Sequence, residues 1–256
     1  MKSRLIILGC GSSVGVPRID GFWGSCNKKN KKNQRSRCSA IIIKGSNRIL
    51  IDTSPDLRNQ LLSNKIKNIS SVIFTHEHAD QTNGLFELRP FYWKYGKKID
   101  IFGDAKTIKH INKTQGYLFK KTNIYPPIVK SNIINKRFSL GKLNEKIHFK
   151  TINVKHGYTS SVVYIFEKTA YISDCNDLSI VKMNELKNLK YLVLDCLKFA
   201  KHPTHFNFDE ALFVHNKLKP GKTILTNLHY DIDYDFLLRK LPKNVLPAYD
   251  GMSLNL

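Results

Sequence analysis

The sequence is poor in paired cysteines, long apolar runs and acidic residues. Its cysteines are scattered and no two of them form a Cys-x-x-Cys pair: Cys10, Cys26, Cys38, Cys175 and Cys196. An odd number at such spacings indicates free thiols in a reducing compartment rather than a disulfide framework. No stretch approaches the roughly 18 apolar residues that a membrane-spanning helix needs. We therefore expect a cytoplasmic protein with no membrane partner.

Acidic residues number only 20 against 42 lysines and arginines, which gives a formal net charge of +22. A basic surface attracts polyphosphate without any sequence preference. Only nine of the basic residues are arginine, however, and the chain is also rich in asparagine and isoleucine, a pattern that a biased genome composition produces. The charge therefore supports an anionic substrate only weakly. For the densest basic run, residues 28–37, a solvated loop is favoured over a phosphate contact.

The 256 residues suffice for one large domain with its own core. We expect a single domain over residues 1–256, with a helix-and-loop insertion near 104–135 as a candidate cover for the site. Strand signals lie at 5–8, 40–43, 48–51, 72–74, 99–102, 147–154, 161–166, 170–172, 191–194 and 223–225. Helical patterns lie at 56–63, 105–115, 179–186, 208–218 and 233–241. This order favours layered α/β or α+β packing.

A histidine-rich motif follows the predicted strand at 72–74. His76, His78 and Asp80 occupy alternate positions. Side chains two residues apart on an extended backbone point to the same side, so both imidazoles can reach one ion. Zinc and similar divalent metals accept imidazole nitrogen and carboxylate oxygen, and a catalytic site leaves a position open for water. The motif therefore predicts a catalytic metal site.

Further candidate ligands also follow predicted strands. His156 comes after residues 152–154, Asp174 after 171–173, and His229 after 224–226. A single residue of this kind more often has a structural role than a metal-binding one. Their shared position at strand ends, however, supports all three together as ligands. Two more histidines, His202 and His205, precede the predicted helix at 208–218, and either is a suitable proton donor near neutral pH. The alternative for this pair is an exposed turn capped by Asn207.

As a set, these motifs resemble the metal motifs of the metallo-β-lactamase superfamily across nearly the whole chain. The opening 8–18 and the closing 247–252 further resemble its branch of phosphoribosyl cyclic phosphate phosphodiesterases and, more distantly, ribonuclease Z. The resemblance implies an α+β fold, a four-layer αββα sandwich with metal ions at one edge between the sheets. It also implies roles for individual residues.

By this resemblance, His76, His78 and His156 hold a first ion and Asp174 bridges to a second. Asp80 serves that second ion and orients the attacking group. His205 is the general acid that protonates or steadies the leaving oxygen, with His202 beside it as a further catalytic candidate. The cofactor is one or two divalent ions, with zinc expected at the first position.

The chain departs from the family pattern at three places. Gln81 stands where the superfamily has a third histidine of the motif, and Asn227 stands where this branch has another, with His229 two residues later. By the resemblance, both changes affect positions that would bind the second ion. A weaker amide ligand there favours manganese, magnesium or iron, or loose occupancy, and His229 is a candidate replacement. Cys26 alone remains of the cysteines that form a small structural zinc site in the cyclic phosphodiesterase, so that zinc is expected to be absent.

The chemistry that follows is hydrolysis of a small or cyclic phosphodiester by a metal-activated water. Arg18 and Arg89 are candidate phosphate clamps, because a guanidinium offers a planar bidentate fork, although a salt bridge is equally expected for each. An RNA 3′-processing nuclease is the nearest alternative, with RNA as the partner. A noncatalytic nucleic-acid-binding relative is the alternative from another class. A homodimer is left open.

Overall fold

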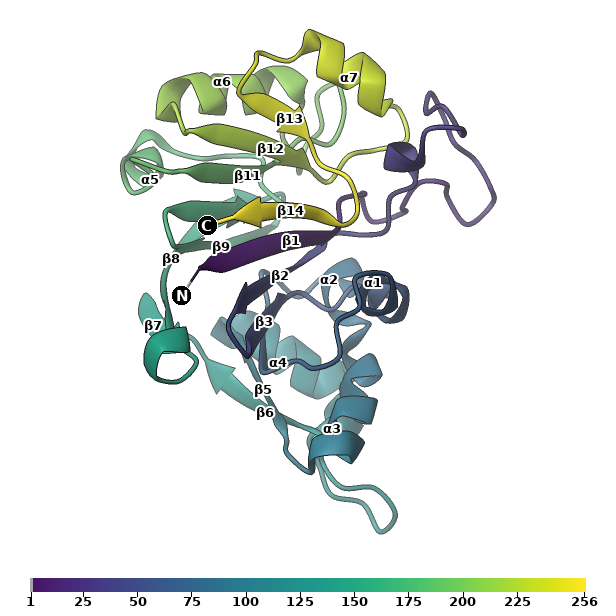
Figure 1. The fold of residues 1–256 in the computed structure, drawn as a ribbon, viewed down its shortest axis with the longest axis vertical. Coiled ribbons are helices and arrows are strands. Elements are labelled where there is room, and N and C mark those ends of the chain that lie inside the picture. Colours follow the sequence, from purple (N-terminus) through teal and green to yellow (C-terminus); the bar gives the residue numbers. More distant parts are fainter. Residues whose placement is uncertain (1) are drawn as a thin grey trace.

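The computed structural model describes residues 2–256 and contains two seven-stranded sheets (Figure 1). The first has the order β14-β1-β2-β3-β4-β5-β6 and the second the order β13-β12-β11-β10-β9-β8-β7. The strands of the first sheet are β1 (Ser3–Gly9), β2 (Ser39–Lys44), β3 (Asn47–Ile51), β4 (Ser71–Ile73), β5 (Ile99–Gly103), β6 (Val129–Ile133) and β14 (Met252–Asn255). Those of the second are β7 (Arg137–Leu140), β8 (Ile147–His156), β9 (Thr159–Phe166), β10 (Thr169–Ile172), β11 (Tyr191–Asp195), β12 (Lys222–Thr226) and β13 (Val245–Pro247).

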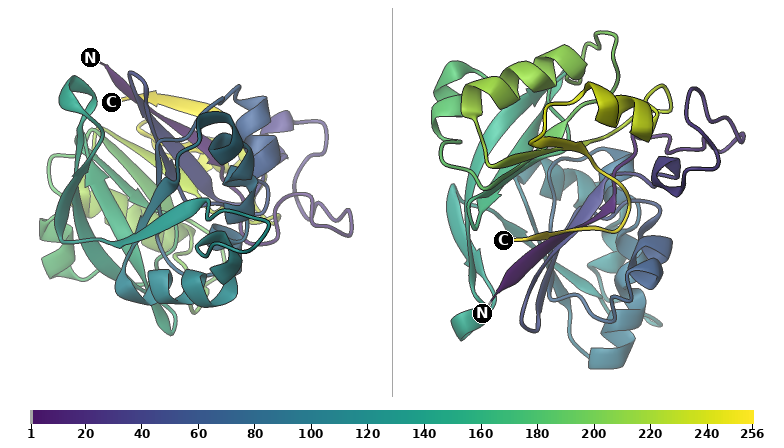
Figure 2. Two further views of the ribbon diagram at one scale, coloured as in Figure 1. Left: turned by 90° about the horizontal axis from the view of Figure 1, so that it is seen from below. Right: turned by 45° about the horizontal axis from the view of Figure 1, so that its top comes forward.

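Helices lie on the outer faces of the two sheets. They are α1 (Leu57–Ser63), α2 (Ala79–Thr82), α3 (Arg89–Tyr95), α4 (Ala105–Thr114), α5 (Ile180–Asn184), α6 (Phe208–Leu218) and α7 (Tyr234–Lys240). Figures 1 and 2 show α1 to α4 beside the first sheet and α6 and α7 beside the second. None of the helices between residues 2 and 256 is long and apolar enough to cross a membrane.

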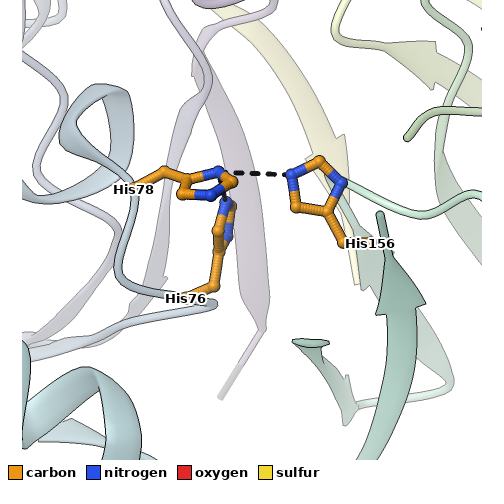
Figure 3. Close-up of side chains that lie close together, drawn as sticks. All are labelled: His76, His78 and His156. Atoms are coloured by element: carbon orange, nitrogen blue, oxygen red, sulfur yellow. Dashed lines mark hydrogen bonds between the residues drawn. The ribbon is translucent and has the colours of Figure 1, made fainter. Parts of the chain in front are cut away.

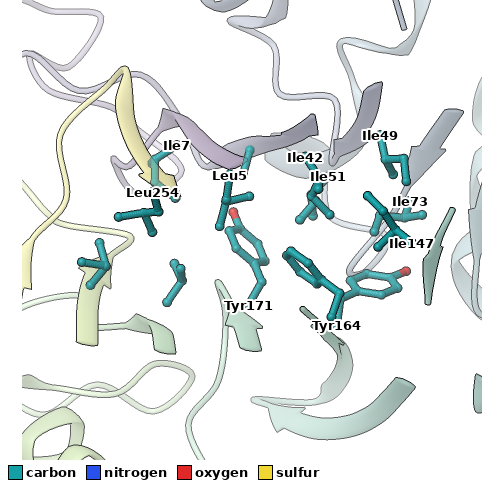
Figure 4. Packing of buried hydrophobic residues seen from close by; sticks show 14 of the residues in the cluster. Leu5, Ile7, Ile42, Ile49, Ile51, Ile73, Ile147, Tyr164, Tyr171 and Leu254 are labelled. Atoms are coloured by element: carbon teal, nitrogen blue, oxygen red, sulfur yellow. The ribbon is translucent and has the colours of Figure 1, made fainter. Parts of the chain in front are cut away.

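Alternate side chains of the central strands enter different cores, which is why these strands are apolar throughout. In β1, Leu5 and Ile7 face the core between the sheets, whereas Ile6 and Leu8 pack against the helices outside (Figure 4). This is the period of two of a strand that is buried on both faces. The arrangement of helices, sheet, sheet and helices confirms the expected α+β sandwich.

The chain near 104–135 is built into the first sheet. Helix α4 connects β5 to β6, and β6 pairs parallel to β5. Ile108 and Ile111 of α4 are buried in the core beneath the helices. The segment therefore completes a β-α-β unit.

The edge where the functional side chains gather is fixed by hydrogen bonds between the two sheets. Directly after β4, the carbonyl of Thr75 accepts from Val162 N at 2.8 Å. The buried phenol of Tyr164 donates to the carbonyl of Phe74 at 2.6 Å. Strands β4 and β9 are thereby joined immediately beside His76. These bonds hold the loop that follows β4 against the second sheet.

Candidate metal centre

Three imidazoles converge at the junction of the sheets (Figure 3). His76 and His78 come from the loop after β4, and His156 ends β8. His78 Nδ1 lies 3.0 Å from His76 Nε2 and 3.3 Å from His156 Nε2. Two nitrogens that each bind a tetrahedral zinc ion at about 2.0–2.1 Å are about 3.3 Å apart. The spacing of these nitrogens therefore matches that of ligands around one ion.

The hydrogen bonds made by Nδ1 of His76 and of His156 indicate which ring nitrogen carries the proton. His76 Nδ1 lies 3.0 Å from Thr75 Oγ1, which in turn lies 2.9 Å from a carboxylate oxygen of Asp52. His156 Nδ1 donates to the carbonyl of Thr204 at 2.7 Å. Burial lowers the pKa of His76 to about 4, so its ring is neutral at neutral pH.

His76 Nε2 is therefore a bare lone pair that faces His78 Nδ1, and His156 Nε2 faces the same nitrogen. A single proton on His78 could serve only one of the two contacts at a time. A divalent cation satisfies all three nitrogens together, and neutral imidazole is the form that binds metals. The three side chains fit such an ion.

A carboxylate lies beside this cluster. Asp174 follows β10, and its Oδ1 lies 4.0 Å from His156 Nε2. Its other oxygen, Oδ2, is buried and has no hydrogen-bond partner among the described residues. An ionised oxygen without a partner in a buried site is costly unless a cation or a proton donor faces it. Asp174 is therefore a suitable oxygen ligand for the same centre.

His205 is held by a second buried carboxylate. His205 Nδ1 lies 2.8 Å from Oδ2 of Asp195, the last residue of β11, and the His205 ring packs edge-on against His156 with centroids 4.8 Å apart. Burial would lower the pKa of His205, but Asp195 outweighs it and raises the pKa to about 9. Burial raises the pKa of Asp195 only to about 6. Near neutral pH the pair is thus an imidazolium and a carboxylate.

Asp80 and two amide side chains complete the group. Asp80 Oδ2 accepts from Gln81 Nε2 at 3.1 Å, and Asn227 Nδ2 donates to Asp174 Oδ1 at 3.3 Å. Burial and the nearby Asp174 raise the pKa of Asp80 to about 6. Gln81 and Asn227 are both buried. The two residues that depart from the family pattern, Gln81 and Asn227, therefore each donate a hydrogen bond to one of these carboxylates.

Most of these side chains border one cavity of about 400 Å³, which is within the usual size of a small-molecule site. Its lining includes His78, Asp80, His156, Asp174, His202, His205, Asn227 and His229, together with Ser12, Ser13, Val14 and Tyr158. Segments far apart in the sequence thus meet at one hollow. The loop after β1 forms one wall, and the turn between β8 and β9 forms another.

Two of the expected catalytic and metal side chains reach the cavity without joining the imidazole cluster. His229 lies 3.0 Å from Asp231 and its ring stacks on Tyr230, with centroids 3.6 Å apart. His202 Nδ1 lies 3.2 Å from Thr204 Oγ1. Neither histidine belongs to the metal-capable clusters found between residues 2 and 256.

The two expected phosphate clamps do not line the cavity. Arg18 forms an ion pair with Asp20 and lies over the rings of Phe22 and Tyr230. Arg89 borders a different, small hollow and lies over Tyr125. The prediction assigned both arginines to the site because they lie near its motifs in the sequence. In the structure, Arg18 on the loop after β1 and Arg89 at the start of α3 lie outside the cavity lining.

Sequence reasoning missed the partners of the functional histidines. Asp195 ends β11 and supports His205, and Asp52 follows β3 and supports Thr75. Both carboxylates stand at strand ends, the same signal that singled out Asp174. Applied to every predicted strand, that rule would have found them.

Thr75→Val is expected to weaken metal binding by about 10–100-fold, as loss of an outer partner of a ligating histidine does. The change removes the hydroxyl beside His76 Nδ1 and leaves Asp52 with one donor fewer. Competition with a chromogenic chelator measures the affinity. Thr82→Val, whose hydroxyl bonds only the carbonyl of His78, is the matched control. Equal affinity in wild type and Thr75→Val would show that the relay does not orient His76.

Comparison with known proteins agrees with this geometry. A solved structure described as a new diphosphatase from the PhnP family has a TM-score of 0.89 and 29% sequence identity, covering 100% of this chain and 98% of that one. The short form of human tRNase Z has a TM-score of 0.69 and 15% identity, covering 98% of each chain, which shows a shared fold.

A curated protein of Porphyromonas gingivalis named octanoyltransferase is 27% identical over 252 residues, which is 97% of this chain but 51% of that protein. The chain thus spans about half the length of this relative, and the relative's name describes the longer protein. Residues 47–230 match the family model of the beta-lactamase superfamily domain. This family and the diphosphatase neighbour support a hydrolase, and the fold implies divalent metal ions that the histidine cluster fits. The chain belongs to the beta-lactamase superfamily, in the metallo-β-lactamase fold and resembling the PhnP and ribonuclease Z branch.

Proposed function

We propose that the chain is a metal-dependent phosphodiesterase that hydrolyses a small or cyclic, nucleotide-like phosphodiester. The observation that carries the proposal is the placement of a carboxylate-supported histidine, His205, next to the three-imidazole cluster in one cavity. Such an arrangement combines an ion site with a proton donor. Hydrolysis of a phosphodiester needs both, since charge develops on phosphoryl oxygens while the leaving oxygen needs a proton.

Zinc suits the imidazole cluster, because it accepts nitrogen ligands in a tetrahedral arrangement. His76 Nε2, His78 Nδ1 and His156 Nε2 would hold it, with Asp174 as the oxygen ligand. When bound, the ion supplies Lewis-acid stabilisation of phosphoryl oxygens and a nucleophile at neutral pH. The remaining steps depend on side chains of the chain itself.

Asp80 and His205 divide the proton transfers. Asp80 borders the cavity, and one of its oxygens is fixed by Gln81, so the other can orient the attacking water and accept its proton. His205 Nδ1 is engaged by Asp195, which leaves Nε2 as the atom that donates to the leaving oxygen. Asp195 stabilises the charged form of the ring, as a carboxylate beside a catalytic histidine does.

The shape of the cavity supports a small ester with an organic ring. A volume of about 400 Å³ suits a mononucleotide-sized ligand better than a folded RNA. At its rim the side chain of Tyr158 is fully exposed at 108% of the reference area. Exposed aromatic rings at such a place stack on bases or sugars. RNA processing remains the alternative, and precursor tRNA is an arm of the substrate screen.

Turnover of bis(p-nitrophenyl) phosphate, with and without added manganese, tests the proposal together with the Asp80→Ala variant. Wild type is expected to hydrolyse the ester in a metal-dependent manner, and Asp80→Ala to lose about 10²–10⁴-fold, as removal of a proton-transfer group does. Asp209→Ala, at the exposed start of α6, is the control. Unchanged turnover in Asp80→Ala would refute this role. A parallel screen of cyclic phosphates, dinucleotides and precursor tRNA identifies the substrate class.

A further inference from the structure

Two overlapping clusters of metal-capable side chains occur at the cavity. One is His76, His78 and His156, and the other is His156, Asp174 and His205. The clusters share His156, so the cavity has room for either one ion or two. The hydrogen bonds around the second cluster decide between these alternatives.

In the second cluster, one donor atom of His205 and one of Asp174 are already engaged. His205 Nδ1, which lies 3.9 Å from Asp174 Oδ1, is held at 2.8 Å by Asp195. Asp174 Oδ1 accepts an N–H from Asn227 at 3.3 Å. The pair that would hold a second ion is thus part of a hydrogen-bond network.

Asn227 presents its amide nitrogen and not its oxygen to this network. Its Nδ2 lies 3.1 Å from the carbonyl of Ser173, an atom that can only accept, and also 3.1 Å from His205 Nδ1. Exchanging the amide oxygen and nitrogen would set an oxygen against both Ser173 O and Asp174 Oδ1, and it would gain only the contact with His205 Nδ1, which Asp195 already engages. The side chain therefore offers N–H bonds, which cannot bind a cation, where a ligand would need a lone pair.

Gln81 does the same for the other carboxylate. It is fully buried; its Nε2 donates to Asp80 Oδ2 at 3.1 Å, and its Oε1 has no hydrogen-bond partner among the described residues. The opposite orientation would place the amide oxygen against that carboxylate oxygen. Asp80 itself lies outside both metal-capable clusters of the described residues. Each of the two acidic side chains is thus capped by a buried amide donor.

We propose that the centre binds a single ion, and that Gln81 and Asn227 are positioning residues whose N–H groups occupy the carboxylate oxygens that a second cation would take. The two amide side chains are uncharged, and their hydrogen bonds hold Asp80 and Asp174 in place. One oxygen of each acidic side chain is thereby satisfied by partial positive charge, and Asp174 Oδ2 is left for the single ion. Hydrolysis would then need one bound ion and the His205 side chain.

Metal counting on protein purified without chelator tests this inference, using native mass spectrometry and elemental analysis after titration with zinc, cobalt or manganese. Wild type is expected to bind one ion per chain. A Gln81→His/Asn227→His double variant replaces both N–H caps with lone-pair donors and is expected to bind a second. With manganese, the double variant should also give the electron paramagnetic resonance signal of two exchange-coupled manganese ions. Wild type should lack this signal.

Gln115→His is the matched control, since Gln115 is a buried amide that donates to the carbonyl of Thr82 away from the cavity. It should keep one ion. If the double variant fails to fold, either single variant serves, with a weaker second site expected. Two ions in wild type with affinities within about tenfold of each other would overturn the inference, and so would a folded double variant that still binds one. The counts need no substrate, so absence of phosphodiester turnover would refute the proposed function and leave this inference standing.

Discussion

Replacing His76 with alanine should remove the ion from the protein and abolish hydrolysis. His76 supplies one of the three converging nitrogens, and its ring is fully buried between β4 and the second sheet. Loss of a direct ligand should exceed the roughly 10–100-fold affinity cost of losing an outer partner. Metal content after gel filtration and the turnover rate on the same sample measure the effect.

The control is His110→Ala, which alters an exposed histidine on helix α4. It should keep the metal content and activity of wild type. Circular dichroism and thermal unfolding show whether His76→Ala is folded, since the change also leaves a cavity in a packed region. Full metal content in a folded His76→Ala would contradict the assignment of the imidazole cluster as the ion site.

Replacing His205 with alanine should lower the rate by about 10²–10⁴-fold on a nucleoside or alkyl phosphodiester, the range for a lost general acid. The loss should be much smaller on bis(p-nitrophenyl) phosphate, because p-nitrophenolate leaves without being protonated. Metal content should stay near that of wild type, since the three-imidazole cluster is intact. Rates on the two esters, each with the metal counted, separate proton donation from metal binding.

His202→Ala distinguishes the two histidines of the same loop. His202 borders the cavity, but its ring contacts Thr204 and lacks the carboxylate partner that His205 has in Asp195. Its replacement should cost far less on either ester. A similar loss on both esters for His205→Ala, or a larger loss for His202→Ala, would move the general acid to another residue.

The interior of each sheet was predictable from the sequence, and its edges were not. All ten predicted strands are present, and the four that the sequence did not reveal are β6, β7, β13 and β14. These are the outermost strands of the two sheets. Inner strands are apolar on both faces and stand out, whereas an edge strand such as Val129–Ile133 carries polar side chains and is short.

Two helices were also missed for local reasons. Helix α2 is a four-residue turn formed directly after His78, too short for a periodic pattern. Helix α3 has a proline in its first turn and ends at Gly96 in the left-handed region, which are proper helix signals. Helix α3 buries none of its residues, so its sequence lacks the apolar period of a packed helix. Its run of aromatic residues obscured the two end signals.

The ligand positions were predictable because they follow strands, and strand ends of these sheets meet at one edge. His156 and Asp174 follow this rule, and so do the supporting carboxylates Asp195 and Asp52 that were overlooked. The arginines were not predictable in this way. Arg18 lies on a loop whose path depends on contacts with Tyr230, about two hundred residues away in the chain.

Titration of metal-stripped protein with zinc or manganese, with turnover and bound metal measured on each sample, tests the central claim most directly. The stripped protein should be inactive on bis(p-nitrophenyl) phosphate. Activity should rise in proportion to bound metal and reach its plateau at one ion per chain. Turnover that survives stripping, or that appears only as a second ion binds, would contradict the account.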